Sequence, residues 1–153
     1  MKLTAREQKA FRHLTEQYLQ DKRVRSMNNY IQHGSITTLA HCMMVAETSF
    51  WLNRRLHLKV NEKSLVTAAL LHDFYLYDWH EKSDAHRLHG FTHAKKAADN
   101  ARRCFAINRQ EYRAICSHMW PLNLTTPPVS RIGWILCLAD KYCAMKETLF
   151  HRR

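Results

Sequence analysis

Apolar residues recur along most of the chain at the three- and four-residue spacing of an amphipathic helix. From Thr4 to about Asp21, for example, Phe11, Leu14 and Tyr18 share one face while charged residues occupy the rest. The same periodicity, interrupted by polar segments, predicts further helices downstream. The expected helical segments cover residues 4–21, 25–31, 36–56, 61–73, 91–104, 108–118 and 127–150.

Residues between these segments carry helix-end signals. A glycine breaks the second segment, and Ser35 after it can cap the third. Asn61 precedes an apolar run, and Asn108 followed by Glu111 resembles a capping box. Pro127-Pro128 suits the first turn of the last helix. Strand alternation of useful length is absent. We therefore expect an all-α fold, a single helical-bundle domain of about six or seven helices over residues 1–153, with residues 1–30 as a helical extension.

Composition narrows the class of protein. A chain of 153 residues suits one domain with a real core, and 46% apolar residues are too many for a disordered chain. Three glycines and three prolines argue against a turn-rich all-β protein. No apolar run approaches the roughly 18 residues of a membrane span, and the charged residues 1–7 lack the apolar core of a signal peptide. Five cysteines without a CxxC pair indicate reduced thiols, so we expect a cytoplasmic protein.

The charge balance favours an anionic partner. Lysine and arginine number 24 against 13 acidic residues, a net charge of +11 with histidine neutral. The basic residues are scattered in pairs such as Arg54-Arg55 and Lys95-Lys96, without the interleaved aromatic residues of single-strand binding proteins. We expect a small anionic phosphorylated substrate, with a nucleotide as the favoured case, and neither nucleic acid nor a membrane as partner. The sequence leaves the oligomeric state open.

Several polar residues lie on the apolar faces of the expected helices. His72-Asp73 ends the apolar run of residues 65–71, and Asp140 lies in the most apolar stretch of the chain. Buried polar groups are costly unless they are paired. Three histidines share this placement: His41, His93 and His118. Each residue alone is compatible with a hydrogen-bonded core side chain. Together they are typical of bundles that bind metal through facing side chains, and imidazole with carboxylate suits Zn, Fe or Mn.

The order His41, His72-Asp73, Asp140 resembles the H…HD…D pattern of the HD-domain superfamily of metal-dependent phosphohydrolases. The flanking residues 40–46, 68–73 and 138–141 are similar to the family's helices as well, and the resemblance covers about residues 30–148. It implies a helical fold and a metal-dependent hydrolase of phosphate ester or anhydride bonds.

Two further histidines refine the resemblance. Residues placed like His93 and His118 are found in the dinuclear subgroup, which includes HD-GYP phosphodiesterases and bacterial hydrolases of symmetrical diadenosine tetraphosphate. A GYP signature is absent here, which argues against cyclic-di-GMP, and Ala94 stands where many relatives have proline.

The resemblance implies two divalent ions, drawn from Fe, Mn, Zn, Co, Ni or Mg. Asp73 would bridge them, and a water between the metals would attack phosphorus in line. The implied ligands of one ion are His41, His72, Asp73 and Asp140, and those of the other are Asp73, His93 and His118. The implied catalytic residues are Asp73, His72 and Lys141.

Other basic residues are candidates for holding the substrate phosphate. These candidates are His86, His89 and Lys96. Each of them, like Lys141, also fits a solvated surface residue. His89 competes with His93 for the ligand role, and His93 is preferred because Ala97 and Ala98 continue its helical face.

Two alternatives remain open at this stage. The same four histidines and two aspartates resemble the mixed-valent diiron oxygenases of the HD superfamily, since these ligands suit iron well. The second alternative is a non-catalytic HD scaffold that binds a nucleotide.

Overall fold

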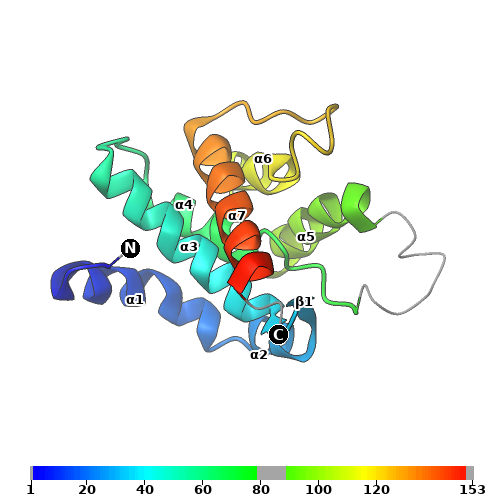
Figure 1. Ribbon diagram of the computed structural model, residues 1–153, viewed down its shortest axis with the longest axis horizontal. Coiled ribbons are helices and arrows are strands. Elements are labelled where there is room, and N and C mark those ends of the chain that lie inside the picture. Colours follow the sequence, from blue (N-terminus) through cyan, green and yellow to red (C-terminus); the bar gives the residue numbers. More distant parts are fainter. Residues whose placement is uncertain (1, 79–88, 151–153) are drawn as a thin grey trace.

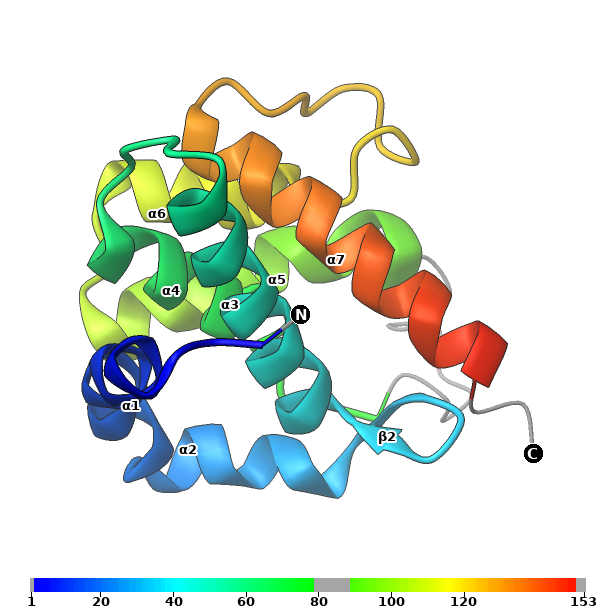
Figure 2. The same ribbon diagram turned by 60° about the vertical axis from the view of Figure 1, so that its left-hand side comes forward.

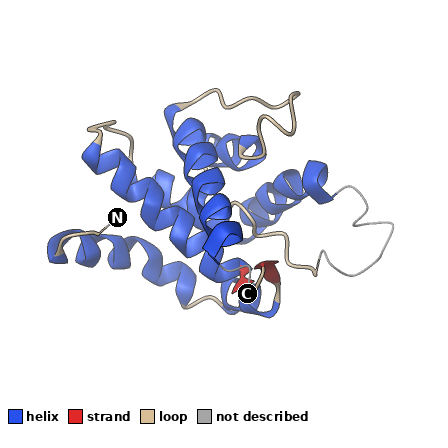
Figure 3. Cartoon of the chain, viewed as in Figure 1, coloured by secondary structure: helices blue, strands red, loops and turns tan. Residues whose placement is uncertain are grey.

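A computed structural model describes residues 2–78 and 89–150 of the chain, apart from the side chains of His33, His89 and Phe150. Helices make up nearly all of its regular structure, which confirms the expected all-α fold (Figure 1, Figure 3). The elements are α1 (Ala5–Leu19), α2 (Lys22–Arg25), the 3-10 helix η1 (Ser26–Asn29), β1 (Ile31–His33), β2 (Ile36–Thr37), α3 (Thr38–Arg55), α4 (Glu62–Leu71), α5 (His89–Phe105), α6 (Arg109–Ser117) and α7 (Arg131–Phe150).

Two helices begin at the caps that the sequence indicates. The side chain of Asn61 accepts a hydrogen bond of 2.9 Å from the Ser64 N–H at the start of α4. Asn108 and Glu111 form a complete capping box at the start of α6. Both caps satisfy backbone N–H groups that have no partner within the helix.

A short β-hairpin lies where the sequence predicted only helix ends. β1 pairs with β2 in antiparallel fashion, with Ile31 opposite Thr37. Gly34 has a φ of 58°, a conformation that glycine adopts without steric cost. The predicted helical segment over residues 25–31 is confirmed only in part, because α2 and η1 are helical up to Asn29 and β1 follows at Ile31. Strands of two and three residues are too short to produce a visible alternation in the sequence.

The predicted start of the third helix, α3, is wrong. Helix α3 begins at Thr38, not at Ile36, since Ile36 belongs to β2. Its cap is Thr37, whose hydroxyl accepts a 3.2 Å hydrogen bond from the Ala40 N–H, and not Ser35. Threonine is β-branched, so it suits both the end of a strand and a helix cap.

Two more helix starts differ from the prediction. Helix α7 begins at Arg131 rather than at Pro127-Pro128, and the Ser130 hydroxyl accepts the Gly133 N–H at 3.1 Å. Proline disfavours the helical conformation in the residue before it, and this keeps the start of α7 beyond Pro127-Pro128. Helix α5 begins at His89, two residues before the predicted position.

Helix α4 forms the centre of the bundle. Every residue from 65 to 71 is buried, which explains the uninterrupted apolar run there. The helix contacts α1, α3, α5, α6 and α7, and α7 lies across α3 and α6 (Figure 2). The Tyr18 hydroxyl of α1 lies 2.8 Å from the Thr67 hydroxyl of α4, so the N-terminal helix packs on the same core. Among the described helices, none has the length and apolar character needed to cross a membrane.

Candidate metal centre

Side chains from five helical segments meet at the middle of the bundle. His41 lies in the second turn of α3, His93 lies in α5, and Asp140 lies midway along α7. His72 and Asp73 directly follow α4, and His118 directly follows α6. All six residues are buried, the most exposed being Asp140 at 8%. They are the six residues that the sequence predicts as metal ligands.

One group of ligand atoms gathers around Asp73 Oδ2. The Nε2 atom of His72 lies 3.3 Å from this oxygen, and that of His41 lies 4.0 Å from it. Asp140 Oδ1 lies 3.1 Å from His41 Nε2 and 3.6 Å from His72 Nε2. Two imidazole nitrogens and two carboxylate oxygens therefore face a common point.

A second group gathers around the other oxygen of the same carboxylate. Asp73 Oδ1 lies 3.2 Å from His93 Nε2 and 3.5 Å from His118 Nε2. The two histidine nitrogens are 3.1 Å apart. The two oxygens of Asp73 are thus divided between two sets of histidines.

The chemistry of these atoms fits divalent cations. Within each of three triads of these residues, the ligand atoms lie within 4.8 Å of one another. Ligands bound at about 2.0–2.2 Å and a right angle lie about 3 Å apart, close to the separations observed. Among the described residues, the buried His72 Nε2 and Asp73 Oδ1 have no hydrogen-bond partner. Such atoms are costly to bury unless a cation or another partner satisfies them.

Backbone carbonyls hold two of the histidine rings in the orientation that ligation needs. His72 Nδ1 lies 2.8 Å from the Ala69 carbonyl oxygen, and His118 Nδ1 lies 2.8 Å from the Ile115 carbonyl oxygen. A ring that donates through Nδ1 keeps its Nε2 lone pair free. In both rings Nε2 is the atom that faces the centre.

The third ring is held by a carboxylate that the sequence analysis missed. His41 Nδ1 lies 2.9 Å and 3.0 Å from the two carboxylate oxygens of Glu147. Glu147 is 4% exposed and stands two helical turns after Asp140 on α7, so both carboxylates lie on one helix face. This seven-residue spacing is the signal that points to Glu147.

The electrostatics of the centre favour positive charge. Burial opposes a charge on His41, but hydrogen bonds to Asp140 and Glu147 outweigh it and raise the pKa of His41 to about 10. Burial likewise opposes ionisation of Asp73, yet the adjacent charge of His72 holds its pKa well below the ordinary value. Burial and the charge of His72 lower the pKa of His118 to about 3, so that ring is neutral. The buried carboxylates of Asp73, Asp140 and Glu147 require compensating positive charge.

A buried polar network also reaches the centre from β1, and the sequence analysis did not identify it. The Gln32 side-chain amide donates a 2.6 Å hydrogen bond to Asp73 Oδ2. Its carbonyl oxygen accepts a 2.6 Å hydrogen bond from the Tyr75 hydroxyl and a 3.3 Å hydrogen bond from the Thr38 hydroxyl. The hairpin therefore contributes directly to the position of the Asp73 carboxylate.

The predicted basic residues lie at different places around the centre. Lys141 is adjacent to it: its Nζ donates a 2.8 Å hydrogen bond to the His118 carbonyl oxygen and lies 3.9 Å from Asp140 Oδ2. Lys96 Nζ lies 4.9 Å from the centroid of the Tyr77 ring. The side chain of His89 and the whole of His86 lie outside the described residues.

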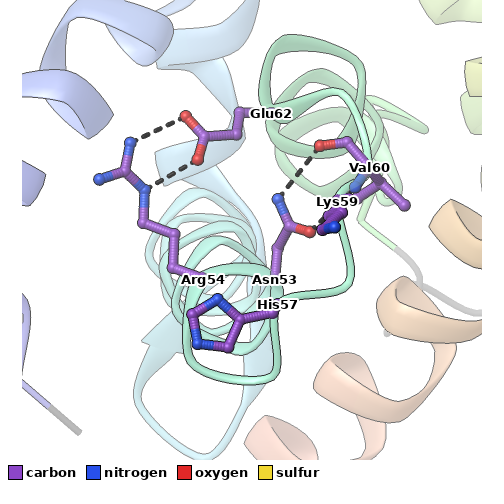
Figure 4. Close-up of a pocket in the computed structure, with 6 residues that line it drawn as sticks. All are labelled: Asn53, Arg54, His57, Lys59, Val60 and Glu62. Atoms are coloured by element: carbon purple, nitrogen blue, oxygen red, sulfur yellow. Dashed lines mark hydrogen bonds and ion pairs between the residues drawn. The ribbon is translucent and has the colours of Figure 1, made fainter.

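A separate pocket lies at the far end of α3. It begins twelve residues after His41, about 18 Å along the helix axis. Its lining residues are Asn53, Arg54, His57, Lys59, Val60 and Glu62 (Figure 4). Arg54 pairs with Glu62 at 2.8 Å, and Asn53 exchanges hydrogen bonds with the Val60 backbone. Its distance along α3 separates this pocket from the centre.

The fold and the centre together define a class: an all-α protein whose bundle holds a buried cluster of histidines and aspartates suited to divalent cations. Comparison with protein families agrees with that class. A sequence model of the HD domain matches residues 38–145, well over half of the chain. The chain belongs to the HD-domain family, a superfamily of metal-dependent phosphohydrolases that bind divalent metals. Neither a curated protein nor a solved structure matches the chain.

Proposed function

We propose that the chain hydrolyses a phosphate ester or anhydride in a small phosphorylated molecule, with a nucleotide as the expected substrate, and that it uses two divalent ions. One observation carries the proposal: the two oxygens of Asp73 face two different sets of histidine nitrogens. A carboxylate placed in this way can bridge two cations. When bound, such ions activate water and neutralise phosphate oxygens.

The chain's own residues have distinct parts in this proposal. His41, His72, Asp73 and Asp140 would hold one ion, and Asp73, His93 and His118 would hold the second. The carbonyls and the carboxylate behind three of the rings keep the Nε2 atoms of His41, His72 and His118 directed at the centre. His93, buried and 3.2 Å from Asp73 Oδ1, is preferred to His89 as the ligand from α5.

Cationic side chains near the centre suit an anionic substrate. Lys141 is 39% exposed while its Nζ lies 3.9 Å from Asp140, so its charge borders both the centre and solvent. It can therefore bind a phosphate oxygen of a substrate held at the centre. Lys96, one turn after His93 and with its Nζ over the Tyr77 ring, is the second candidate for binding the substrate phosphate. The net charge of +11 attracts anions from solution and supports this substrate class.

Metal analysis of the freshly purified chain, followed by phosphatase and phosphodiesterase assays with Mn, Fe, Co, Ni and Mg, tests the proposal. About two ions per chain and metal-dependent phosphate release are expected. Asp73→Ala should lose both ions, whereas His93→Ala and His118→Ala should each retain about one. Each of these variants should lose more than about 100-fold in turnover, because even outer partners of ligands cost 10–100-fold. The exposed His13→Ala is the matched control and should keep both ions.

Two results would contradict parts of this proposal. Wild-type metal content and turnover in both His93→Ala and His118→Ala would show a single-ion centre. A mixed-valent signal in electron paramagnetic resonance, with oxygen consumption and no phosphate release, would favour the diiron oxygenase. The four-histidine, two-aspartate set supports that second candidate, since both ligand types suit iron.

A further inference from the structure

The outward face of α7 is unusually apolar. Eight described side chains of this helix are exposed, and three of them are Arg131, Lys146 and Thr148. The other five are large and apolar, with exposures from 41% to 66%: Trp134, Leu138, Tyr142, Met145 and Leu149. We refer to these five residues as the α7 stripe. A surface helix normally turns polar residues outward, so the stripe requires an explanation.

The stripe runs straight along one side of the helix. At 100° per residue, its five members fall within an arc of about 80°. The arc lies opposite Asp140 and Glu147, which face the metal centre. The described elements that α7 contacts most are α3, α4, α6 and β1, and in Figure 1 the helix lies across the front of the molecule. Helix α7 is therefore apolar on two sides, and the described part of the chain covers one.

The exposed apolar area is a large part of what a dimer interface requires. Aromatic side chains bury 150–250 Å² each and leucine and methionine somewhat less, so at these exposures the five together present on the order of 500 Å². Monomers rarely expose contiguous apolar patches above a few hundred Å². A specific interface covers about 800 Å² on each partner. We propose that a second copy of this chain covers the α7 stripe.

The spacing of the stripe is self-complementary, as a two-fold interface needs. Trp134 and Leu149 have the same midpoint in sequence as Leu138 and Met145, and Tyr142 lies beside that midpoint. Two antiparallel copies of α7 would place Trp134 against Leu149 of the second copy and Leu138 against its Met145. Antiparallel packing also opposes the two helix dipoles.

Charge argues for a copy of this chain over an acidic partner. The five residues of the stripe are uncharged, and the exposed Arg131 is the one charged side chain of α7 within the same arc, so recognition of the stripe rests mainly on apolar contact. Two copies, each carrying +11, repel one another, and salt screens that repulsion. The dimer should therefore tighten as salt concentration rises, whereas binding to an anionic partner would weaken.

Sedimentation velocity on the full chain tests the proposal. As the protein concentration is raised to about 100 µM, the mass should rise from 18.2 kDa to twice that value. The rise should occur at lower protein concentrations in 0.5 M salt than in 0.15 M salt. Leu138→Glu should weaken the dimer by at least about 10-fold, because it places a charge near the centre of the interface. Leu56→Glu is the matched control: Leu56 is also 59% exposed but lies at the end of α3, so its dimer should be unchanged.

Cross-linking tests the antiparallel arrangement. A mixture of Leu138→Cys and Met145→Cys chains should form a covalent heterodimer on oxidation, faster than either variant alone. Thermal melting by circular dichroism verifies that each variant is folded. A wild-type chain that stays monomeric at all concentrations and salts overturns the proposal, as does a Leu138→Glu chain that dimerises like wild type. A monomer that instead sediments with lipid vesicles would assign the stripe to a membrane surface and would also overturn it.

Discussion

At the scale of single residues, the histidines of the centre are oriented in two ways. His72 and His118 each directly follow a helix and donate to the carbonyl three residues earlier. The last carbonyls of a helix have no partner within it, so they are available to orient a ring. His41 lies within α3, where the carbonyls are already used, and its ring is held instead by Glu147 from another helix.

Removing that carboxylate should weaken the centre without removing a ligand. We expect Glu147→Ala to lower metal affinity or turnover by about 10–100-fold, because His41 loses the partner that fixes its ring. Glu147→Gln should have a smaller effect, since its amide oxygen still accepts the Nδ1 proton. Metal titration of the stripped protein measures the change.

The control for this prediction lies on the same helix as His41. Glu47 is exposed, so Glu47→Ala should leave metal affinity unchanged. Equal metal affinity in Glu147→Ala and wild type would mean that the Glu147 contact does not orient His41.

At the scale of single elements, one acidic residue of α1 caps its own helix and also pairs with α3. Glu7 closes the capping box with Thr4 and accepts hydrogen bonds of 2.9 Å and 3.0 Å from Arg55 of α3. The hydrogen bonds from the Thr4 backbone and from Arg55 lower the pKa of Glu7 from 4.5 to about 2. One side chain thus connects the start of α1 to the end of α3.

Glu7→Gln should lower the melting temperature at neutral pH. A carboxyl whose pKa is lower in the folded chain stabilises the fold above its unfolded pKa of 4.5, and this contribution disappears as pH falls to about 2. The difference between wild type and Glu7→Gln should therefore shrink over that range. Thr4→Ala, which removes the cap itself, should cost about 1 kcal/mol.

Melting curves at several pH values check this prediction. The exposed Glu16→Gln in the same helix is the matched control and should melt like wild type at every pH. A difference for Glu7→Gln that stays constant down to pH 2 would show that the ionised carboxylate is not the stabilising form.

At the scale of the whole molecule, the centre is where the bundle elements converge. α3 and α7 contribute from one side, and α5 and α6 from the other, with the end of α4 between them. Bound cations would therefore connect segments that are nearly a hundred residues apart. A ligand that binds the folded chain and not the unfolded chain raises the free energy of unfolding.

Metal should accordingly raise the melting temperature. At a free concentration 100 times its dissociation constant, an ion adds about 2.7 kcal/mol. For a chain of this size that corresponds to a rise of about 5–10 °C. Differential scanning calorimetry with and without a chelator measures the shift. In Asp73→Ala the same metal should produce no rise, and an equal rise there would place the stabilising ion elsewhere.

The sequence alone determined the helical class and the six polar residues on buried faces. Helical periodicity and burial are both visible in the spacing of apolar residues over a few turns of chain. Asn61 and Asn108 fixed two helix starts, since capping acts over three residues. The sequence did not determine the hairpin, because its strands are too short for a pattern. It also did not determine the start of α7, where the cap is Ser130 and not the prolines.

Only the tertiary structure decided how the six residues are divided and what supports them. The sequence order gives no distances, whereas the fold directs Asp73 Oδ2 at His72 and Oδ1 at His93. The spacing from Asp140 places Glu147 on the same face of α7, but only the fold shows that it pairs with His41. Gln32 reaches the centre from a hairpin, a contact that no local pattern encodes. The exposed side of α7 is likewise decided by the tertiary structure. The sequence shows that this helix face is apolar, but only the position of the neighbouring elements shows whether it is covered.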